Sequence, residues 1–261
     1  MTEILGARIV ENREVARATR WLVIETDEPP EMAYVPGHIV ALYVPSPGEK
    51  WVRHPYTVSW AEGARIGVLY RVVRGGRTSP FMATMTAGDT LRLGGRFGEA
   101  VSTLVDPEAA AIVGVSTGSG VGPLHGFAAR ALPNDPRPIT LLAGFRDAAD
   151  AALVPELDAL AAAHPHFSWR AALSRPDAGA LAGRALAGRV TAHVGTLRAL
   201  GVSPLATHWH LIGNGAMAID LRAGLLAGGV SRERVTFETY HNRGTSPDLA
   251  VVAAIAAALA R

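Results

Sequence analysis

The sequence has no cysteine among its 261 residues. Disulfides, thiolate zinc sites, cysteine nucleophiles and cysteine-ligated iron–sulfur clusters are therefore excluded within this chain. The sequence also has no large excess of one sign of charge, because it contains 25 lysines and arginines and 23 aspartates and glutamates. The resulting net charge of +2 argues against a nucleic-acid-binding stripe, although a local basic patch for an acidic partner protein stays open.

Long apolar runs are missing as well. The apolar segment at residues 249–259 falls short of the roughly 20 residues that a membrane-spanning helix needs. Residues 1–5 lack the basic and apolar regions of a secretory signal. We therefore expect a cytoplasmic protein without a membrane span. The content of 49% hydrophobic and 18% charged residues is typical of a globular enzyme.

The first hundred residues have the pattern of β-structure. Short β-branched segments are bounded by turn residues such as Pro36-Gly37. Strands are expected at residues 8–10, 19–25, 39–44 and 66–73. Many short strands of this kind predict a small, closed antiparallel β-barrel. One helix is expected at residues 79–85, with Ser79 as its cap and Pro80 at its first helical position.

After about residue 106, apolar strands alternate with helical stretches rich in alanine and leucine. The expected strands are residues 111–115, 139–143, 167–173, 208–212 and 235–240. This alternation predicts a parallel α/β sheet with helices on both faces. We place the domain boundary at Asp106-Pro107. The amino-terminal domain is then residues 1–105 and the carboxy-terminal domain residues 106–261, with an extension from about residue 241.

A glycine-rich turn at residues 116–123 directly follows the first strand of the second half and precedes a helical stretch at 124–132. Glycines let the main chain approach a ligand, and a helix N-terminus favours negative charge, so this pattern is typical of phosphate binding. A second strand, 208–212, also ends in small residues. In an open α/β sheet, two such loops can flank one ligand crevice. A turn that serves packing alone is the alternative.

Two motifs in the first half precede this turn, at residues 54–57 (His-Pro-Tyr-Thr) and 76–79 (Gly-Arg-Thr-Ser). Together with residues 116–123 they follow the order found in the ferredoxin–NADP reductase superfamily, the flavin and pyridine-nucleotide oxidoreductases. The chain resembles this family over nearly its whole length. The resemblance implies a flavin, FAD, in the barrel domain and NADP or NAD in the α/β domain.

Residues 54–57 resemble the family's Arg-x-Tyr-Ser/Thr flavin motif, with His54 in the arginine position, as in the His-Pro-Phe-Thr form of NADPH oxidases and ferric reductases. The resemblance implies that Tyr56 packs against the flavin and that Thr57 places its hydroxyl near flavin N5. Arg53 could substitute for the missing guanidinium. A tyrosine that only faces the barrel core is the alternative.

Residues 76–79 resemble the family's Gly-x-x-Ser, whose amides and hydroxyl hold the flavin phosphate at a helix start; an ordinary helix cap is the alternative. The flavin contacts implied by the two motifs are Arg53, His54, Pro55, Tyr56, Thr57, Gly76, Arg77, Thr78 and Ser79.

Residues 116–123 resemble the family's Gly-Thr-Gly-x-Gly-x-Ala-Pro nicotinamide loop, with Ser116 and Gly122 as departures. The family's Cys-Gly pair maps to Ile212-Gly213. Since isoleucine cannot donate a hydrogen bond, hydride transfer here would proceed by positioning alone, and less efficient nicotinamide docking is expected. The implied nucleotide contacts in these loops are Thr117, Gly118, Gly120, Pro123, Gly213, Asn214 and Met217.

Ser174-Arg175 follows the third strand of the second half, where NADP-preferring relatives place Ser/Thr and Arg on the adenosine 2′-phosphate. An arginine fork suits a phosphate dianion, whereas enzymes that select NAD more often place an acidic residue on the ribose. Arg184 and Arg189 could supplement this contact. A solvated surface arginine is the alternative.

Residues 237–240 resemble the carboxy-terminal Val-Glu-Thr-Tyr of plant and cyanobacterial reductases. In those proteins the tyrosine covers the flavin, and the glutamate is implicated in proton or electron delivery. Thr57, Glu238 and Tyr240 are therefore the candidate catalytic residues, and strand alternation puts Glu238 and Tyr240 on one side. The chain continues through residues 241–247 into a helix, so Tyr240 or the extension could cover the flavin; a core tyrosine is the alternative.

No metal site is predicted. The pairs His164-x-His166 and His208-x-His210 each have the spacing that puts both rings on one face of a strand. Zinc needs further ligands, and without cysteines only distant histidines or carboxylates are left.

The resemblance implies hydride transfer from NADPH, or NADH, to FAD and then electron donation to a one-electron carrier such as ferredoxin or flavodoxin, because a flavin can pass electrons singly. An NAD(P)H:flavin reductase or the reductase of an oxygenase system is the alternative. A non-enzymatic flavin electron-transfer subunit of a larger complex is a second alternative, best supported by Ile212.

Overall fold

The computed structural model describes residues 4–28, 33–46, 49–175, 181, 183–201, 203–241 and 246–260. The chain divides into two compact units: residues 1–103 with 122–127, and residues 104–121 with 128–261. Residues 242–245, within the predicted extension, lie outside the described part of the chain.

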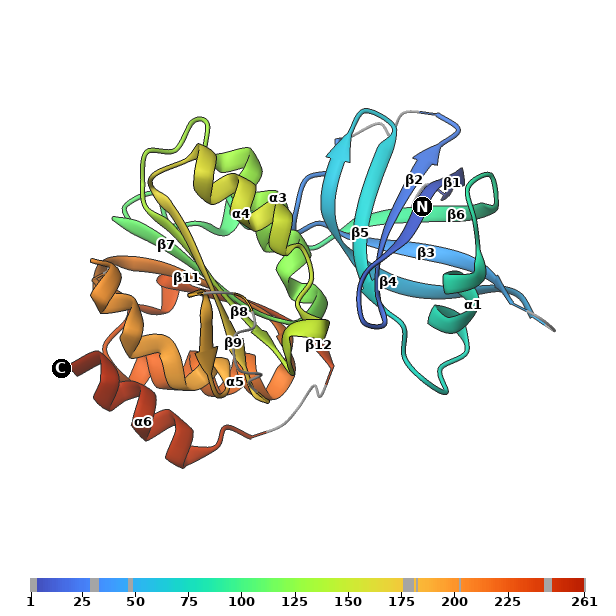
Figure 1. Cartoon of the computed structure of the whole chain (residues 1–261). Helices are drawn as coiled ribbons and strands as arrows, with labels where there is room; N and C mark the ends of the chain where they lie inside the picture. The colour runs from blue at the N-terminus through green and yellow to red at the C-terminus, as the bar shows by residue number, and fades with distance from the viewer. Residues whose placement is uncertain are drawn as a thin grey trace. The chain divides into compact units, whose positions relative to one another are not determined.

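The first unit contains a closed antiparallel barrel with the strand order β1-β2-β5-β4-β3-β6, as the sequence predicts (Figure 1). Closure leaves the sheet without unpaired edges. Strands β4 and β6 are additional to the four that were expected. The elements are β1 (Ile4–Ala16), β2 (Thr19–Thr26), β3 (Ile39–Ser46), β4 (Glu49–Glu62), β5 (Arg65–Arg71), α1 (Thr78–Thr84), β6 (Thr90–Phe97) and α2 (Val101–Leu104).

The barrel interior follows from the period of two along its strands. On β3, Val40, Leu42 and Val44 have no exposed surface, while the residues between them face the other side. Leu22 on β2 and Ile66 on β5 are buried in the same apolar cluster. This core fixes β4 and the start of α1, which carry the two barrel motifs.

The expected start of the barrel helix is wrong. The helix begins at Thr78, its N-cap is Arg77, and no side chain caps it. The Ser79 hydroxyl instead accepts a hydrogen bond from the backbone N–H of Val73, at 2.9 Å. Pro80 is tolerated within the first turn because N–H groups there have no partner inside the helix.

The second unit contains a six-stranded parallel sheet with the order β10-β9-β8-β7-β11-β12. The five predicted strands are confirmed, and the short edge strand β10 is added to them. The strands are β7 (Ala111–Thr117), β8 (Ile139–Phe145), β9 (Phe167–Leu173), β10 (Ala185–Ala187), β11 (Thr207–Asn214) and β12 (Val235–His241).

Helices cover both faces of this sheet, with α3 and α4 on one face and α5 and α6 on the other (Figure 1). Trp209 and Leu211 on β11 are fully buried in one core with Leu221 of α5 and Ile255 of α6. The helices are α3 (Val121–Ala131), α4 (Val154–Ala163), α5 (Gly215–Ala227) and α6 (Leu249–Ala260), with 3-10 turns η1 (Gly118–Gly120), η2 (Ala148–Asp150), η3 (Val190–Leu200), η4 (Pro204–Ala206) and η5 (Arg232–Arg234).

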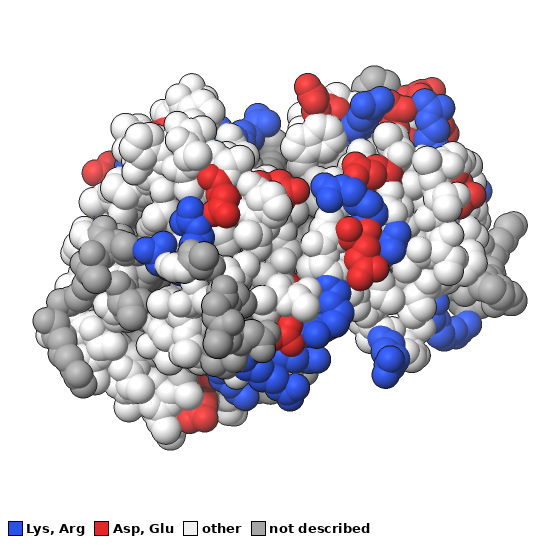
Figure 2. All heavy atoms as spheres, viewed as in Figure 1, with Lys and Arg blue, Asp and Glu red and all other residues white. Residues whose placement is uncertain are grey.

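The helix predicted in the extension is α6, which packs closely on α5. Gly224 and Gly228 permit this approach, because a Cβ on Gly224 would lie 2.6 Å from Ile255 Cβ and one on Gly228 2.5 Å from Leu259 Cδ1. Among the described residues, no helix combines the length and apolar character needed to cross a membrane. Basic and acidic side chains lie scattered and in small groups on the face drawn in Figure 2.

Candidate functional site

The two glycine-containing loops of the second unit meet at the point where the strand order changes direction. The chain goes from β7 outward through β8 to β10, and then returns to add β11 on the other side of β7. The backbone N–H of Asn214, at the end of β11, donates to Thr117 Oγ1, at the end of β7, over 2.8 Å. This is the topological switch point at which open parallel sheets bind ligands, so the predicted pairing of the two loops is present.

Close packing of the two loops requires glycine at two positions. Gly213 has a φ of +130°, and a Cβ there would lie 2.8 Å from the carbonyl oxygen and 3.0 Å from the nitrogen of Thr117. A Cβ on Gly120 would lie 2.6 Å from the carbonyl oxygen of Ile212. Larger residues at either position would separate the loops.

The start of α3 offers backbone N–H groups for an anion. The N-cap residue, Gly120, has no side chain to cap this helix, and the first turn contains no acidic residue. Gly118 has a φ of +55°, and among the described residues no atom other than those of its chain neighbours lies within 4 Å of its Cβ position. An uncapped helix start beside an open glycine suits a diphosphate group, so this loop fits the nucleotide that the sequence predicts.

Several of the predicted nucleotide residues have structural contacts of their own, as Thr117 does with Asn214. The Asn214 side chain caps α5 by accepting a hydrogen bond from the Ala216 N–H at 2.9 Å. Met217 is 7% exposed and belongs to the apolar core of the second unit. Pro123 is buried in the first turn of α3.

Ile212, at the family's cysteine position, is fully buried. It pairs with Ser116 on β7 and with Glu238 on β12. Beyond this row the β11–β12 register shifts, since Gly213 pairs with Thr239 and Asn214 with His241. Tyr240 is thus the extra residue of a bulge, and simple alternation does not fix its side relative to Glu238.

Two arginines lie next to each other at the ends of β8 and β9. The N–H of Arg175 donates to the carbonyl oxygen of Arg146 over 2.7 Å, and the N–H of Ser174 donates to that of Phe145 over 3.0 Å. The Arg146 side chain is 52% exposed and lies 3.9 Å from a carboxylate oxygen of Asp150. Sequence reasoning missed Arg146, although its position just after a predicted strand was a usable signal.

The two supplementary arginines differ in their availability. Arg184 forms a 2.6 Å ion pair with Asp158, and its guanidinium lies 5.3 Å from the centre of the Trp169 ring. It is therefore engaged within the fold. Arg189 is exposed to solvent.

The two barrel motifs contact each other directly. His54 on β4 and Thr78 at the start of α1 share a hydrogen bond of 2.8 Å between Nε2 and Oγ1. Tyr56 on β4 contacts Tyr70 edge-to-face, with ring centres 6.2 Å apart. Burial is the main cause that raises the pKa of the Tyr56 phenol, so this ring stays neutral. The motifs that the resemblance assigns to one flavin thus lie in one place.

The remaining β4 motif residues face the other side of the strand by alternation. The Arg53 guanidinium lies 5.4 Å from the centre of the exposed Phe97 ring, Pro55 is exposed, and Thr57 is 7% exposed. In the turn before α1, the Gly76 N–H donates to the Val73 carbonyl oxygen at 2.9 Å. The first turn of α1 holds no acidic residue and no side-chain cap, and an exposed arginine, Arg77, adjoins it. The first turn of α1 and the Arg77 guanidinium suit the diphosphate of a flavin dinucleotide.

No metal centre is found in the described part of the chain, where no three His, Cys, Asp or Glu residues are grouped for a cation. His208 Nε2 and His210 Nδ1 both contact the Thr236 hydroxyl, at 3.0 and 2.8 Å. The pair therefore serves a hydrogen-bond network.

Family models and curated proteins agree with this arrangement. The oxidoreductase FAD-binding domain matches residues 6–101, and the oxidoreductase NAD-binding domain matches residues 115–220. The chain is 34% identical over 103 residues to one subunit of a Na(+)-translocating NADH-quinone reductase from Neisseria meningitidis serogroup C, covering 39% of this chain and 25% of that one. It is 27% identical over 173 residues to the toluate 1,2-dioxygenase electron transfer component of Pseudomonas putida, covering 66% and 50%. The matches thus span a quarter to a half of these relatives.

Solved structures match nearly the whole chain. The Amycolatopsis cytochrome P450 reductase GcoB has a TM-score of 0.78 and 26% identity, covering 92% of this chain and 71% of that one. A ferredoxin NADP+ reductase from Neisseria gonorrhoeae with bound FAD and NADP has a TM-score of 0.76 and 20% identity, covering 91% and 98%. With the barrel motifs in contact, two loops at a switch point and both domain models matched, the chain belongs to the ferredoxin–NADP reductase superfamily as an FAD- and NAD(P)-binding oxidoreductase.

Proposed function

We propose that this protein is an NAD(P)H-dependent reductase that passes electrons through FAD to a one-electron carrier protein such as ferredoxin or flavodoxin. The observation that carries the proposal is the joined pair of loops at the β7–β11 switch point, beside the uncapped start of α3. The first unit supplies the flavin motifs, in which His54 contacts Thr78. FAD, when bound, supplies the hydride acceptor and delivers electrons one at a time.

The residues of this chain have distinct roles in the proposal. Gly118, Gly120 and the first turn of α3 bind the nucleotide diphosphate, while Arg77 and the turn before α1 bind that of FAD; Arg53 faces the other side of β4 from His54 and is not assigned to the diphosphate. Tyr56 packs on the flavin, and Thr57 holds its hydroxyl at the ring edge. Positioning of this kind supplies most of the catalysis in a hydride transfer.

Two residues of β12 are proposed to take part in the reaction. Glu238 would exchange a proton during electron transfer, and Tyr240, the extra residue of the β11–β12 bulge, would cover the flavin ring until the nicotinamide enters.

We further propose a preference for NADPH over NADH. Arg146 and Arg175 lie at adjacent strand ends, are joined through a backbone hydrogen bond, and can form a two-arginine site for the 2′-phosphate. Arg175→Gln should weaken NADPH binding about tenfold and leave NADH binding unchanged, since one charge-assisted contact is lost. Equal losses for both nucleotides would contradict this preference.

An oxygenase system is the second candidate for the electron acceptor. The similarity to a dioxygenase electron transfer component and to a cytochrome P450 reductase favours it. Either acceptor requires that reduced nicotinamide bleach the bound flavin. A subunit that holds flavin without oxidising nicotinamide would not, and the buried Ile212 is the feature that favours such a subunit.

Anaerobic titration of the FAD-loaded protein with NADPH and with NADH tests the proposal. We expect loss of the flavin absorption with either nucleotide, at lower concentration for NADPH. Turnover is then compared with ferredoxin, flavodoxin, free flavin and an oxygenase component as acceptors. Flavin that stays oxidised under excess NADPH and NADH would refute the reductase function.

A further inference from the structure

Asn12, in the middle of β1, contacts the end of α1 with both of its amide protons. Its Nδ2 donates to the carbonyl oxygens of Met82 and Met85, each at 2.8 Å. Met82 lies in the last turn of α1, and Met85 is its C-cap. The last carbonyls of a helix lack an N–H donor four residues further on, and the Met82 carbonyl also accepts the Met85 N–H at 3.2 Å, so Asn12 adds a C-terminal capping contact from a different strand.

The other side of the same amide faces two donors. Asn12 Oδ1 accepts from the Tyr70 hydroxyl and from Arg20 Nε, each at 3.0 Å, and Arg20 also donates to the Asn12 carbonyl oxygen at 2.6 Å. Arginine can only donate and a carbonyl can only accept, so the amide has one possible orientation. All the hydrogen-bonding capacity of the side chain is used.

Tyr70 extends this network to the motif at residues 54–57. It is 1% exposed, and burial raises the pKa of its phenol to about 12, so the hydroxyl remains a donor to Asn12. The Tyr70 ring lies edge-on to Tyr56, with ring centres 6.2 Å apart. One side chain on β1 therefore contacts α1 directly and Tyr56 through Tyr70.

We propose that Asn12 is a positioning residue for FAD: it sets α1, whose first turn carries Thr78 and Ser79, in register with Tyr56 on β4. The inference rests on the proposed function only in taking Tyr56 and residues 76–79 as flavin contacts. A side chain at residue 12 that lacked the two N–H donors would leave the Met82 and Met85 carbonyls without this partner. The phosphate-holding turn and the ring-packing tyrosine would then keep the His54–Thr78 contact but lose the link that runs through Asn12 and Tyr70.

Asn12→Asp is the sharpest variant, because it keeps an acceptor for Tyr70 and Arg20 but turns a carboxylate toward two carbonyl oxygens. We expect the dissociation constant for FAD to rise about tenfold or more, since two hydrogen bonds are lost and repulsion is added. The visible absorption band of the bound flavin should shift, because Tyr56 no longer holds its place. Tyr70→Phe keeps the ring and loses one bond, so we expect a rise of about threefold.

Ile66→Val is the matched control. Ile66 is fully buried in the barrel core on β5 but makes none of these contacts, so its variant should lower the melting temperature and leave FAD affinity and spectrum unchanged. A wild-type dissociation constant and spectrum in Asn12→Asp would overturn the proposal. If Asn12→Asp does not fold, unchanged FAD affinity and spectrum in Tyr70→Phe would overturn it equally.

Hydrogen exchange in the FAD-free protein separates this inference from the proposed function. The amides of α1 should exchange at least tenfold faster in Asn12→Asp than in Ile66→Val, because the helix loses its cap. If the wild-type protein binds no FAD, the proposed function fails, while these exchange rates still decide whether Asn12 holds α1. Equal exchange in the two variants would show that it does not.

Discussion

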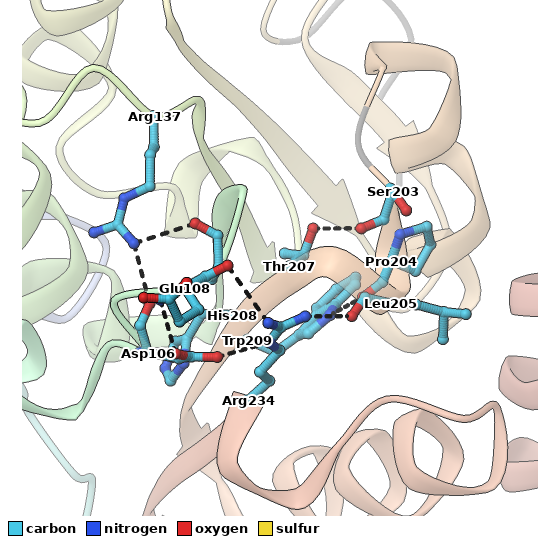
Figure 3. A network of polar contacts seen from close by, with 11 residues as sticks. Asp106, Glu108, Arg137, Ser203, Pro204, Leu205, Thr207, His208, Trp209 and Arg234 are labelled. Carbon is cyan, nitrogen blue, oxygen red and sulfur yellow. Dashed lines mark hydrogen bonds and ion pairs between the residues drawn. The ribbon is translucent and has the colours of Figure 1, made fainter.

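At its carboxyl edge the parallel sheet ends in glycine loops, whereas at its amino edge it ends in a network of charged and buried polar side chains. Asp106, just before β7, donates its N–H to His208 Nδ1 at 3.2 Å and accepts from Arg137 through its carbonyl oxygen at 3.0 Å. Its carboxylate pairs with Arg234 at 2.7 Å, which holds the pKa of Asp106 below its usual range (Figure 3).

One sheet thus serves two purposes. At the amino edge, each of the polar groups of Asp106 has a protein partner, so a ligand would have to displace existing bonds. At the carboxyl edge, the start of α3 has no side-chain cap, and Gly118 borders open space. Backbone N–H groups without side-chain partners can bind an anion, whereas polar groups that are hydrogen-bonded within the protein stabilise the fold.

The largest expected effect concerns the buried histidines of the amino edge and pH. Burial lowers the pKa of His210 to about 3 and that of His208 to about 4. In the unfolded chain a histidine takes up a proton below about pH 6.5, but these two do not do so while folded. The unfolded state therefore binds more protons between these limits, and stability falls as the pH falls from about 6.5 toward 4.

Replacement of His210 isolates this effect. His210→Leu removes a ring whose Nε2 has no hydrogen-bond partner among the described residues, but it also removes the Nδ1 contact with Thr236, so the free energy of unfolding at pH 7 should change little. At pH 4 the variant should be more stable than the wild type by about 3 kcal/mol. Urea unfolding at the two pH values measures the difference. If the free energy of unfolding has the same pH dependence in the wild type and the variant, His210 does not have the lowered pKa described above.

The next effect concerns the carboxyl edge. Gly213→Ala places a Cβ against the Thr117 backbone at a φ of +130°, so it should push the two loops apart and weaken NAD(P)H binding by about 2 kcal/mol or more. Fluorescence titration with NADPH measures this loss, and FAD binding should persist. Gly229→Ala, at a φ of +94° near the amino edge, has the same kind of backbone strain but a nearest contact of 3.5 Å. Equal loss of nucleotide affinity in both variants would remove the distinction between the edges.

Much of the architecture could be predicted from local pattern. The period of two on β3 and the apolar strands after residue 106 indicated the barrel and the parallel sheet, and both are present. That the two glycine loops lie at the same edge of the sheet was also predictable, because parallel strands place their carboxyl ends together. The strands themselves depend on residues close in the sequence, whereas the contact of Asn214 with Thr117 joins residues 97 apart.

Features that depend on long-range contacts could not be predicted. Asn12 lies 70 residues from Met82, and nothing in its local sequence indicates that it contacts α1. Ser79 has the residue type of a helix cap, but the Val73 amide competes for its hydroxyl. The pairing of Asp106 with Arg234, 128 residues away, requires knowledge of the strand order. Local propensity does not contain that information.

The smallest effect compares the same substitution at the two edges. Arg137 binds Asp135 with a two-pronged contact and donates to the carbonyl oxygens of Asp106 and Ala109, and lysine cannot reproduce this fork. Arg137→Lys should lower the free energy of unfolding by about 1 kcal/mol without changing NADPH affinity. Arg146→Lys, at the carboxyl edge, should lower NADPH affinity and leave the free energy of unfolding unchanged. The Arg146 side chain is half-exposed and lies 3.9 Å from Asp150, so it contributes little to the fold. Chemical denaturation measures the stability of both variants, and titration with NADPH measures their nucleotide affinity. Equal losses of stability in the two variants would show that arginines at the two edges stabilise the fold to the same extent.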